Sequence, residues 1–320
     1  MLTSQMVKES AIKGGADLCG IASVKRYKDA PPETHPNSLF PEAKSVIVYA
    51  SRILKGSYKG IQEGTDWSTY WIYGYGNGIY SALGGATGAI AALLDDHGYE
   101  AVQSPGGHTL LDEAPPAREP LAEDKLPPCI MLHMRISAAL AGLGEFGWSK
   151  VFLTPEFGPR QRFEILLTDA ELEPDPLFQE HICDKCMACI RNCPGHALGG
   201  ERKSIQVEGR EFEWSKVDYG KCKVTHWGFN PNASPFVKKD LPGMQMEVEK
   251  TNYTWYEAFR LGYALSDRVE YMKLIANGSA EHGQGGRPGS VCGGVGCLQA
   301  CSAHLEARGV PKGGAKGDKD

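Results

Sequence analysis

Four closely spaced cysteines constrain this chain more than any other feature of its sequence. Two residues separate Cys183 from Cys186 and Cys186 from Cys189, and Cys193 follows after three more, directly before Pro194. This is the bacterial ferredoxin spacing, in which three thiolates hold one 4Fe-4S cluster and the fourth ligates a second cluster. The spacing therefore predicts an iron–sulfur protein, and it requires further cysteines elsewhere.

The further cysteines lie downstream and bring the number of predicted ligands to eight, enough for two clusters. By the crossover rule, the first cluster takes the three closely spaced thiols and the last cysteine of the chain: Cys183, Cys186, Cys189 and Cys301. The second cluster takes the remaining four: Cys193, Cys222, Cys292 and Cys297. Zinc is the alternative metal, although structural zinc sites generally use two separated pairs. Cys19 and Cys129 lie outside both sets, and we expect them to be buried, inert thiols.

The residues before the cysteine run predict a mixed α/β or α+β domain. Residues 44–51 are rich in β-branched residues and predict a strand, while residues 78–97 carry apolar side chains at helical spacing. A hairpin is predicted in which residues 151–154 pair with residues 163–168 around a Pro/Gly turn. Alternating strands and helices of this kind are typical of one layered domain, which we place at residues 1–178.

Residues 179–310 are predicted to form a ferredoxin-like domain with two 4Fe-4S clusters. An aromatic-rich insertion at 223–291 interrupts it, and residues 254–276 within the insertion have a helical pattern. Three roles are open for the insertion: a cap over a substrate pocket, a shield for the clusters, or a homodimer interface, since aromatic residues are enriched at such sites. The polar tail at 311–320 is expected to be disordered.

Composition and charge narrow the partners. A net charge of -5 and a pI near 6.0 give no general attraction to nucleic acid or to anionic membranes. No apolar stretch approaches the roughly 20 residues that cross a bilayer. The N-terminus shows neither a secretory signal nor a twin-arginine motif. We therefore expect a cytoplasmic protein.

The stretch "AGLGEFGWSKVFLTPEFGPRQRFEILLTDAELEPDP", running straight into "CDKCMACIRNCPGHAL", resembles the epoxyqueuosine reductase and reductive dehalogenase superfamily. The N-terminal "GADLCGIA" and "KSVIVYA" resemble it too, so the resemblance spans roughly residues 10–200 and the later cysteines. It implies a nitroreductase-like domain at 1–178 that holds base-off cobalamin beside the two clusters. It further implies that low-valent cobalt drives removal of a halide or hydroxyl while a nearby acid donates a proton.

The same resemblance suggests catalytic candidates. Epoxyqueuosine reductases use an aspartate before an Ala-Pro pair, and "LLDEAPP" offers Asp112, which alternatively caps a turn or pairs with Arg118. Reductive dehalogenases instead use a tyrosine with a basic neighbour. The stretch "STYWIYGYGNGIY" offers four tyrosines, Tyr70, Tyr73, Tyr75 and Tyr80. From these we take Tyr73 and Tyr75 as candidates, with packing in an aromatic core as the alternative.

Candidate cobalamin contacts precede the cysteine run. The histidine and arginine have the chemistry to contact a corrin amide, a nucleotide phosphate or the substrate, and glycines allow close approach of a planar cofactor. The candidates are His133, Arg135, Gly142, Gly144, Gly147 and Lys150. The alternative for His133 and Arg135 is that they are ordinary surface residues whose hydrogen bonds are satisfied without a cofactor.

Together these features predict an iron–sulfur, cobalamin-dependent reductase that cleaves a carbon–heteroatom bond of a small molecule by dehalogenation or deoxygenation. Reduced ferredoxin or flavodoxin is the expected electron donor. One alternative is a dicluster electron-transfer protein or accessory subunit without corrinoid. Another is an epoxyqueuosine reductase acting on tRNA. The acidic charge and the absence of a helical-repeat segment after Cys301 speak against tRNA as the substrate.

Overall fold

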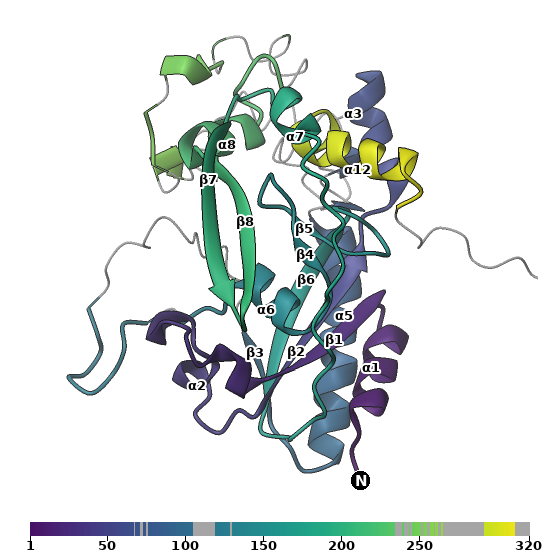
Figure 1. Cartoon of the computed structure of the whole chain (residues 1–320), viewed down its shortest axis with the longest axis vertical. Coiled ribbons are helices and arrows are strands. Elements are labelled where there is room, and N and C mark those ends of the chain that lie inside the picture. Colours follow the sequence, from purple (N-terminus) through teal and green to yellow (C-terminus); the bar gives the residue numbers. More distant parts are fainter. Residues whose placement is uncertain are drawn as a thin grey trace, which may run out of the picture.

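A four-stranded antiparallel sheet organises the first part of the chain (Figure 1). The computed structural model describes residues 1–66, 68–70, 73–74, 76–104, 119–128, 130–233, 239, 243, 245–250, 252–254, 257–258, 260–261, 264 and 291–310. The strands lie in the order β1 (Leu18–Ser23), β2 (Ser45–Arg52), β6 (Gln161–Thr168), β3 (Ala101–Ser104). Mixed α/β architecture is thereby confirmed, as is the predicted strand at 44–51, which the structure places one residue later.

Helices α1 (Ser4–Lys13) and α5 (Asn77–Asp96) cover one face of this sheet. Leu83, Ile90 and Leu94 of α5 are fully buried there, as their helical spacing predicts. The two helices meet closely because glycines stand at the contact. A Cβ atom on Gly85 would lie 2.5 Å from the carbonyl oxygen of Gly14, so neither position has room for a side chain.

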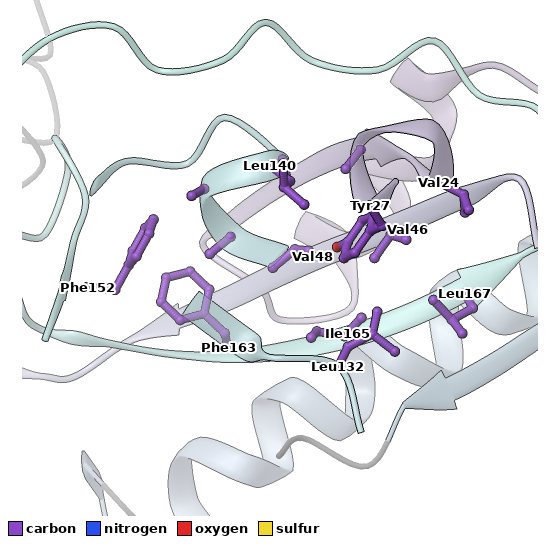
Figure 2. Close-up of a cluster of buried hydrophobic side chains, with 14 of the residues drawn as sticks. Val24, Tyr27, Val46, Val48, Leu132, Leu140, Phe152, Phe163, Ile165 and Leu167 are labelled. Atoms are coloured by element: carbon purple, nitrogen blue, oxygen red, sulfur yellow. The ribbon is translucent and has the colours of Figure 1, made fainter. Parts of the chain in front are cut away.

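The opposite face of the sheet packs against α6 (Met134–Leu140). Because strand side chains alternate between faces, Val46 and Val48 of β2 point to this side while Ile47 and Tyr49 point to α1 and α5. Figure 2 shows the two valines with Ile165 of β6 in this second core. The sheet is therefore buried on both faces.

The predicted hairpin between 151–154 and 163–168 is wrong in its pairing. Residues Phe152–Leu153 form β5, which pairs with β4 (Glu145–Phe146), whereas β6 pairs with β2 and β3. A tight turn explains the difference, since Thr154 bridges to Gly158 and the chain reverses before β6 begins. The eight residues of β6 are buried or half-buried, which suits a central strand of the sheet.

The segment between Cys193 and Cys222 forms a long hairpin that the sequence did not lead us to expect. Strands β7 (Leu198–Val207) and β8 (Arg210–Val217) join through Glu208 and Gly209, both with positive φ, as two-residue hairpin turns require. Phe212 and Trp214 of β8 are buried against the second core. The hairpin thus packs onto the first domain as well as separating two cysteines.

The cysteine-bearing part also contains the α-helices α7 (Ala188–Arg191), α8 (Tyr219–His226) and α12 (Cys297–Ala307). The helix α12 packs against α7, although more than a hundred residues separate them in the sequence (Figure 1). The insertion helix predicted at 254–276 lies mostly outside the described residues, and the tail at 311–320 lies wholly outside them. Within the described parts of the chain, no helix has the length and apolar character needed to span a membrane.

The contact between α1 and α5 generates a stability prediction. Gly85→Ala puts a methyl group against the backbone of Gly14 and should lower the free energy of unfolding by about 1–3 kcal/mol. Gly84→Ala, one residue earlier in the same helix, meets no atom within 4 Å and should raise it by about 0.5–1 kcal/mol. Thermal unfolding of the two variants measures this, and equal Tm values would contradict the assigned contact.

Candidate metal centres

One cavity brings together four of the thiols. Cys183 and Cys186 line it from the loop that leads into α7, Cys189 lines it from α7 itself, and Cys301 lines it from α12. Its empty volume is about 340 Å³, part of which is open to solvent. Burial raises the pKa of Cys189 to about 11, with Cys183 adding to the rise. Burial likewise raises the pKa of Cys301, and Cys183, Cys189 and Cys186 raise it by smaller amounts.

The loop around this cavity is shaped by its backbone. Lys185 and Met187 adopt the left-handed conformation, with φ of 56° and 60°, and so turn the chain sharply between successive cysteines. The side chain of Asp184 accepts a hydrogen bond from the Cys186 N–H at 3.2 Å. The Trp148 N–H donates to Cys183 Sγ at 3.3 Å, the type of contact that stabilises a metal-bound thiolate.

An ion-pair network joins this loop to α12. Asp184 Oδ2 accepts from His304 Nε2 at 2.8 Å and from Arg308 at 3.2 Å, and the His304 hydrogen bond is the main cause that lowers the pKa of Asp184. Arg308 also donates to the carbonyl of Ile182 at 3.0 Å. These contacts hold α12, and with it Cys301, against the loop that carries the other three thiols.

The remaining four thiols form a second group. Cys193 follows α7, Cys222 lies on α8, Cys292 lies in η8 (Val291–Gly294), and Cys297 begins α12. Burial raises the pKa of Cys292, with Cys222 and Cys193 as the next causes. Burial also raises the pKa of Cys297, followed by Cys292, Cys222 and Cys193. The four thiols therefore lie close enough to interact electrostatically.

Cationic groups surround this second group. Solvent reaches the side chain of Cys222, yet the protein packed around its thiol raises the pKa to about 11, and Lys223 and Arg135 oppose that rise. Burial lowers the pKa of Lys223 to about 8, against the influence of Cys222 and Cys292. The structure thus places the predicted cofactor contact Arg135 near the second thiol group.

The grouping has the composition that the crossover arrangement requires. Two sets of four cysteines suit 4Fe-4S clusters, because thiolates are their usual ligands and the run that supplies them has the ferredoxin spacing. Cluster binding itself stays a prediction. Cys19 belongs to neither group: it lies in β1, and burial raises the pKa of its thiol to about 12. Cys129 lies outside the described residues.

His133 and Lys150, two of the predicted cofactor contacts, both interact with other residues in the interior of the protein. His133 is buried, and its Nδ1 accepts the Ile136 N–H at 3.2 Å as the N-cap of α6. The ammonium group of Lys150 is also buried, 4.9 Å from the ring centres of both Trp214 and Tyr219, and it contacts the Tyr219 hydroxyl. Their predicted contact with a corrinoid stays a prediction.

The three glycines before the cysteine run pack against the protein's own chain. A Cβ atom on Gly142 would lie 2.1 Å from the Pro176 carbonyl oxygen, and one on Gly144 would lie 2.0 Å from that of Leu153. Gly147 has the side chain of Leu153 at 3.1 Å. Backbone packing therefore explains these glycines without a planar cofactor.

Of the three catalytic candidates, Asp112 and Tyr75 lie outside the described residues, and Tyr73 is 53 % exposed. Among the described tyrosines of residues 68–80, Tyr70 hydrogen-bonds to a basic group. Its buried hydroxyl accepts a hydrogen bond from Arg162 at 2.8 Å, and its ring stacks on Tyr58 at 5.1 Å.

Tyr70 also adjoins the second thiol group. Burial raises its pKa, Arg162 opposes the rise, and Cys292 and Cys297 add to it. A Cβ atom on Gly293 would lie 2.6 Å from the Tyr70 ring, which places η8 against that ring. The sequence signal that we missed is Arg162, a charged residue near the start of a strand that lies inside the sheet.

Two further titratable groups lie near Arg162. Burial raises the pKa of Tyr80 on α5, with Arg162 lowering it and Glu164 raising it. Burial also raises the pKa of Glu164, which accepts a hydrogen bond from Gln103 at 3.4 Å. Arg162 and Glu164 are two residues apart on β6 and so project to the same face of the sheet.

Sequence comparison identifies relatives. The tetrachloroethene reductive dehalogenase of Sulfurospirillum multivorans is 27 % identical over 147 residues, which cover 40 % of this chain and 29 % of that enzyme. The epoxyqueuosine reductase of Listeria monocytogenes is 30 % identical over 104 residues, which cover 30 % and 27 %. The chain is a homologue of both kinds of reductase. No family model matches it.

The homology is partial in length. The matched segments span less than a third of either curated relative. Among solved structures, the catabolic reductive dehalogenase NpRdhA aligns with a TM-score of 0.47 at 19 % identity, covering 88 % of this chain and 37 % of that one. Whether this chain has the activity of these homologues is therefore a matter for a proposal.

The two thiol groups generate a prediction about ligand assignment. In protein reconstituted anaerobically with iron and sulfide, Cys301→Ala should disturb the cluster of the first group and Cys193→Ala that of the second. EPR of the reduced protein and iron counts measure both. Adding Cys186→Ala to Cys301→Ala should cause little further loss, because both thiols serve one cluster. Cys19→Ala is the matched control, since this buried thiol belongs to neither group. If Cys301→Ala and Cys193→Ala disturb the same signal, the crossover assignment is wrong.

Proposed function

We propose that this protein is an iron–sulfur and cobalamin-dependent reductase that removes a halide or a hydroxyl from a small organic molecule. One observation carries the proposal: the second thiol group adjoins the buried Tyr70, whose hydroxyl accepts a hydrogen bond from Arg162. A route for single electrons thus ends close to Arg162, which also lies near the candidate proton donor Tyr80. The homology to reductive dehalogenases and epoxyqueuosine reductases supports the same class of reaction.

The residues near Arg162 are compatible with a large planar cofactor. Gly84 and Gly88 lie one and two turns after Tyr80 on the same face of α5, and neither has any atom within 4 Å where a side chain would begin. This open face adjoins Tyr80 and Glu164, whose pKa values are both raised by burial. Groups with shifted pKa values are found at many functional sites. We assign cobalamin to this face.

The net reaction replaces the leaving group with hydrogen. It consumes two electrons and one proton, and it releases the halide, or the hydroxyl as hydroxide. When bound, cobalamin supplies a low-valent cobalt that takes part in breaking the carbon–heteroatom bond. The protein supplies the two thiol groups as a path for electrons from a donor such as reduced ferredoxin or flavodoxin.

Within this scheme Tyr80 donates the proton from its phenol oxygen. The side chain is 39 % exposed on the open face of α5. A phenol is protonated at neutral pH because its ordinary pKa is about 10, and burial raises the pKa of Tyr80 further. Arg162 stabilises the phenolate that remains, because its charge favours the ionised form. Tyr70 acts through Arg162, which it holds in place by the 2.8 Å hydrogen bond.

The relationship to an epoxyqueuosine reductase supports a second candidate, action on a tRNA nucleoside. A net charge of -5 offers no general electrostatic attraction to RNA. We therefore prefer a small-molecule substrate.

Cofactor binding tests the proposal. Protein reconstituted with iron, sulfide and hydroxocobalamin should hold about eight irons, two 4Fe-4S sets, and one corrinoid with a base-off cobalt(II) EPR signal. Gly88→Leu should abolish corrinoid binding and keep the iron, because it fills the open face of α5. Gly56→Leu, at another open glycine outside this helix, should bind both. Full iron content without bound corrinoid in the unsubstituted protein would contradict the proposal and favour a dicluster electron carrier.

Proton donation generates a separate prediction. Tyr80→Phe should bind clusters and corrinoid but lose about 10²–10⁴-fold in dehalogenation rate. The assay uses titanium(III) citrate as reductant and a panel of chlorinated ethenes and halophenols. Tyr73→Phe serves as the comparison, since it tests the exposed tyrosine named from the sequence. Wild-type turnover by Tyr80→Phe, on a substrate that the unsubstituted protein reduces, would remove Tyr80 as the donor.

A further inference from the structure

The proposed reaction does not use the buried carboxylate of Glu145. This residue lies on β4, and only 5 % of it is exposed. Oε1 accepts hydrogen bonds from the backbone N–H groups of Ile182, at 2.6 Å, and Cys183, at 2.8 Å. Oε2 lies 3.2 Å from His181 Nδ1 and 3.0 Å from Arg210. The Glu145 carboxylate therefore makes four contacts, three of which are to residues 181–183, where the first predicted ligand lies.

Arg210 extends the same contact to the preceding residues. It lies at the start of β8 and donates to the carbonyl of Glu180 at 3.0 Å and to that of Phe178. The pair thus holds the chain from residue 178 to residue 183 through both its carbonyl and its N–H groups. Hydrogen bonds to charged groups are the stronger kind, and burial shields them from solvent.

The pair has an electrostatic consequence as well as a structural one. Reduction adds negative charge to a cluster held by these thiols, so the buried Glu145 carboxylate nearby disfavours the reduced state and the half-buried Arg210 guanidinium favours it. Glu145 also engages the N–H group of Cys183, which is therefore not available to donate to a cluster sulfur.

We propose that Glu145 and Arg210 are positioning residues that hold the Cys183 loop and set the reduction potential of the first thiol group's cluster, Glu145 lowering it and Arg210 raising it. The inference rests on the iron–sulfur part of the proposed function and is independent of the corrinoid. Opposite effects from the two partners of one ion pair distinguish an electrostatic role from a purely structural one, since loss of structure would act in one direction.

The test is a potentiometric EPR titration of the reconstituted full chain. Glu145→Gln should shift the midpoint of the first cluster to a more positive potential, and Arg210→Gln should shift it to a more negative one. The double substitution should fall between the two. The second cluster should keep its midpoint throughout. Glu208→Gln is the matched control, because Glu208 lies in the same hairpin but pairs with Lys28, 3.5 Å away.

Hydrogen exchange on the cluster-free chain provides a readout that does not depend on cluster assembly. In Glu145→Ala, the amides of Ile182 and Cys183 should exchange faster, while that of Cys222, which donates to the Asp218 carbonyl, should not change. Unchanged protection of the two amides would overturn the positioning role, and shifts of the same sign from Glu145→Gln and Arg210→Gln would overturn the electrostatic one. Failure of the iron–sulfur part of the proposed function looks different, because the unsubstituted chain would then hold no iron, and failure of the corrinoid part alone would leave both readouts unchanged.

Discussion

The two thiol groups are tied together by two helical elements that serve both. Cys297 and Cys301 are four residues apart on α12, so they lie one helical turn apart, about 5–6 Å. Cys189 lies within α7, and Cys193 follows two residues after the end of that helix. Each helix with its flanking residues thus supplies one thiol to each group, and the packing of α12 on α7 brings these four thiols together. This contact joins residues that are distant in sequence, and the rest of the fold must hold it in place.

Ion pairs from the first domain support that contact. Glu306 of α12 receives Lys55 at 3.0 Å and lies 3.7 Å from the buried Arg160, which also donates to the carbonyl of Ile53. Arg308 reaches the carbonyl of Ile182 in the cysteine loop. Helix α12, which supplies a thiol to each group, is therefore attached to the part of the chain that carries the four-stranded sheet on one side and to the segment at residues 182–189 on the other.

The sequence predicted those parts of the site that local spacing governs. Ligand spacing divided eight cysteines into two sets of four, and the structure gathers the first set, Cys183, Cys186, Cys189 and Cys301, around one cavity. That either set binds a cluster stays a prediction. The β-branched run of β2 and the apolar spacing of α5 were equally local signals. The pairing of β5 with β4 was not local, and the hairpin prediction failed because a turn pattern shows where a chain reverses but not which strand receives it.

Tertiary contacts explain what the sequence did not show. Tyr70 could be chosen among neighbouring tyrosines only after β6 had brought Arg162 to its hydroxyl. The sequence did not indicate a role for Glu145, because its hydrogen-bond partners lie far along the chain, at residues 181–183 and 210. The charges along β7 and β8 likewise obscured an alternation that buries Phe212 and Trp214.

The hairpin of β7 and β8 has more than a spacing role between Cys193 and Cys222. The ring of Phe146 lies 5.2 Å from that of Phe212 and 5.6 Å from that of Trp214, and the Ser215 N–H donates to the carbonyl of Trp148. Burial of each large aromatic side chain stabilises such packing by roughly 2–3 kcal/mol. The hairpin thereby holds the segment from β4 to Trp148, which supplies both the Glu145 carboxylate and the N–H group that reaches Cys183. The core beneath the hairpin is continuous with the segment that supports the first thiol group, so a loss of packing there would displace these thiols.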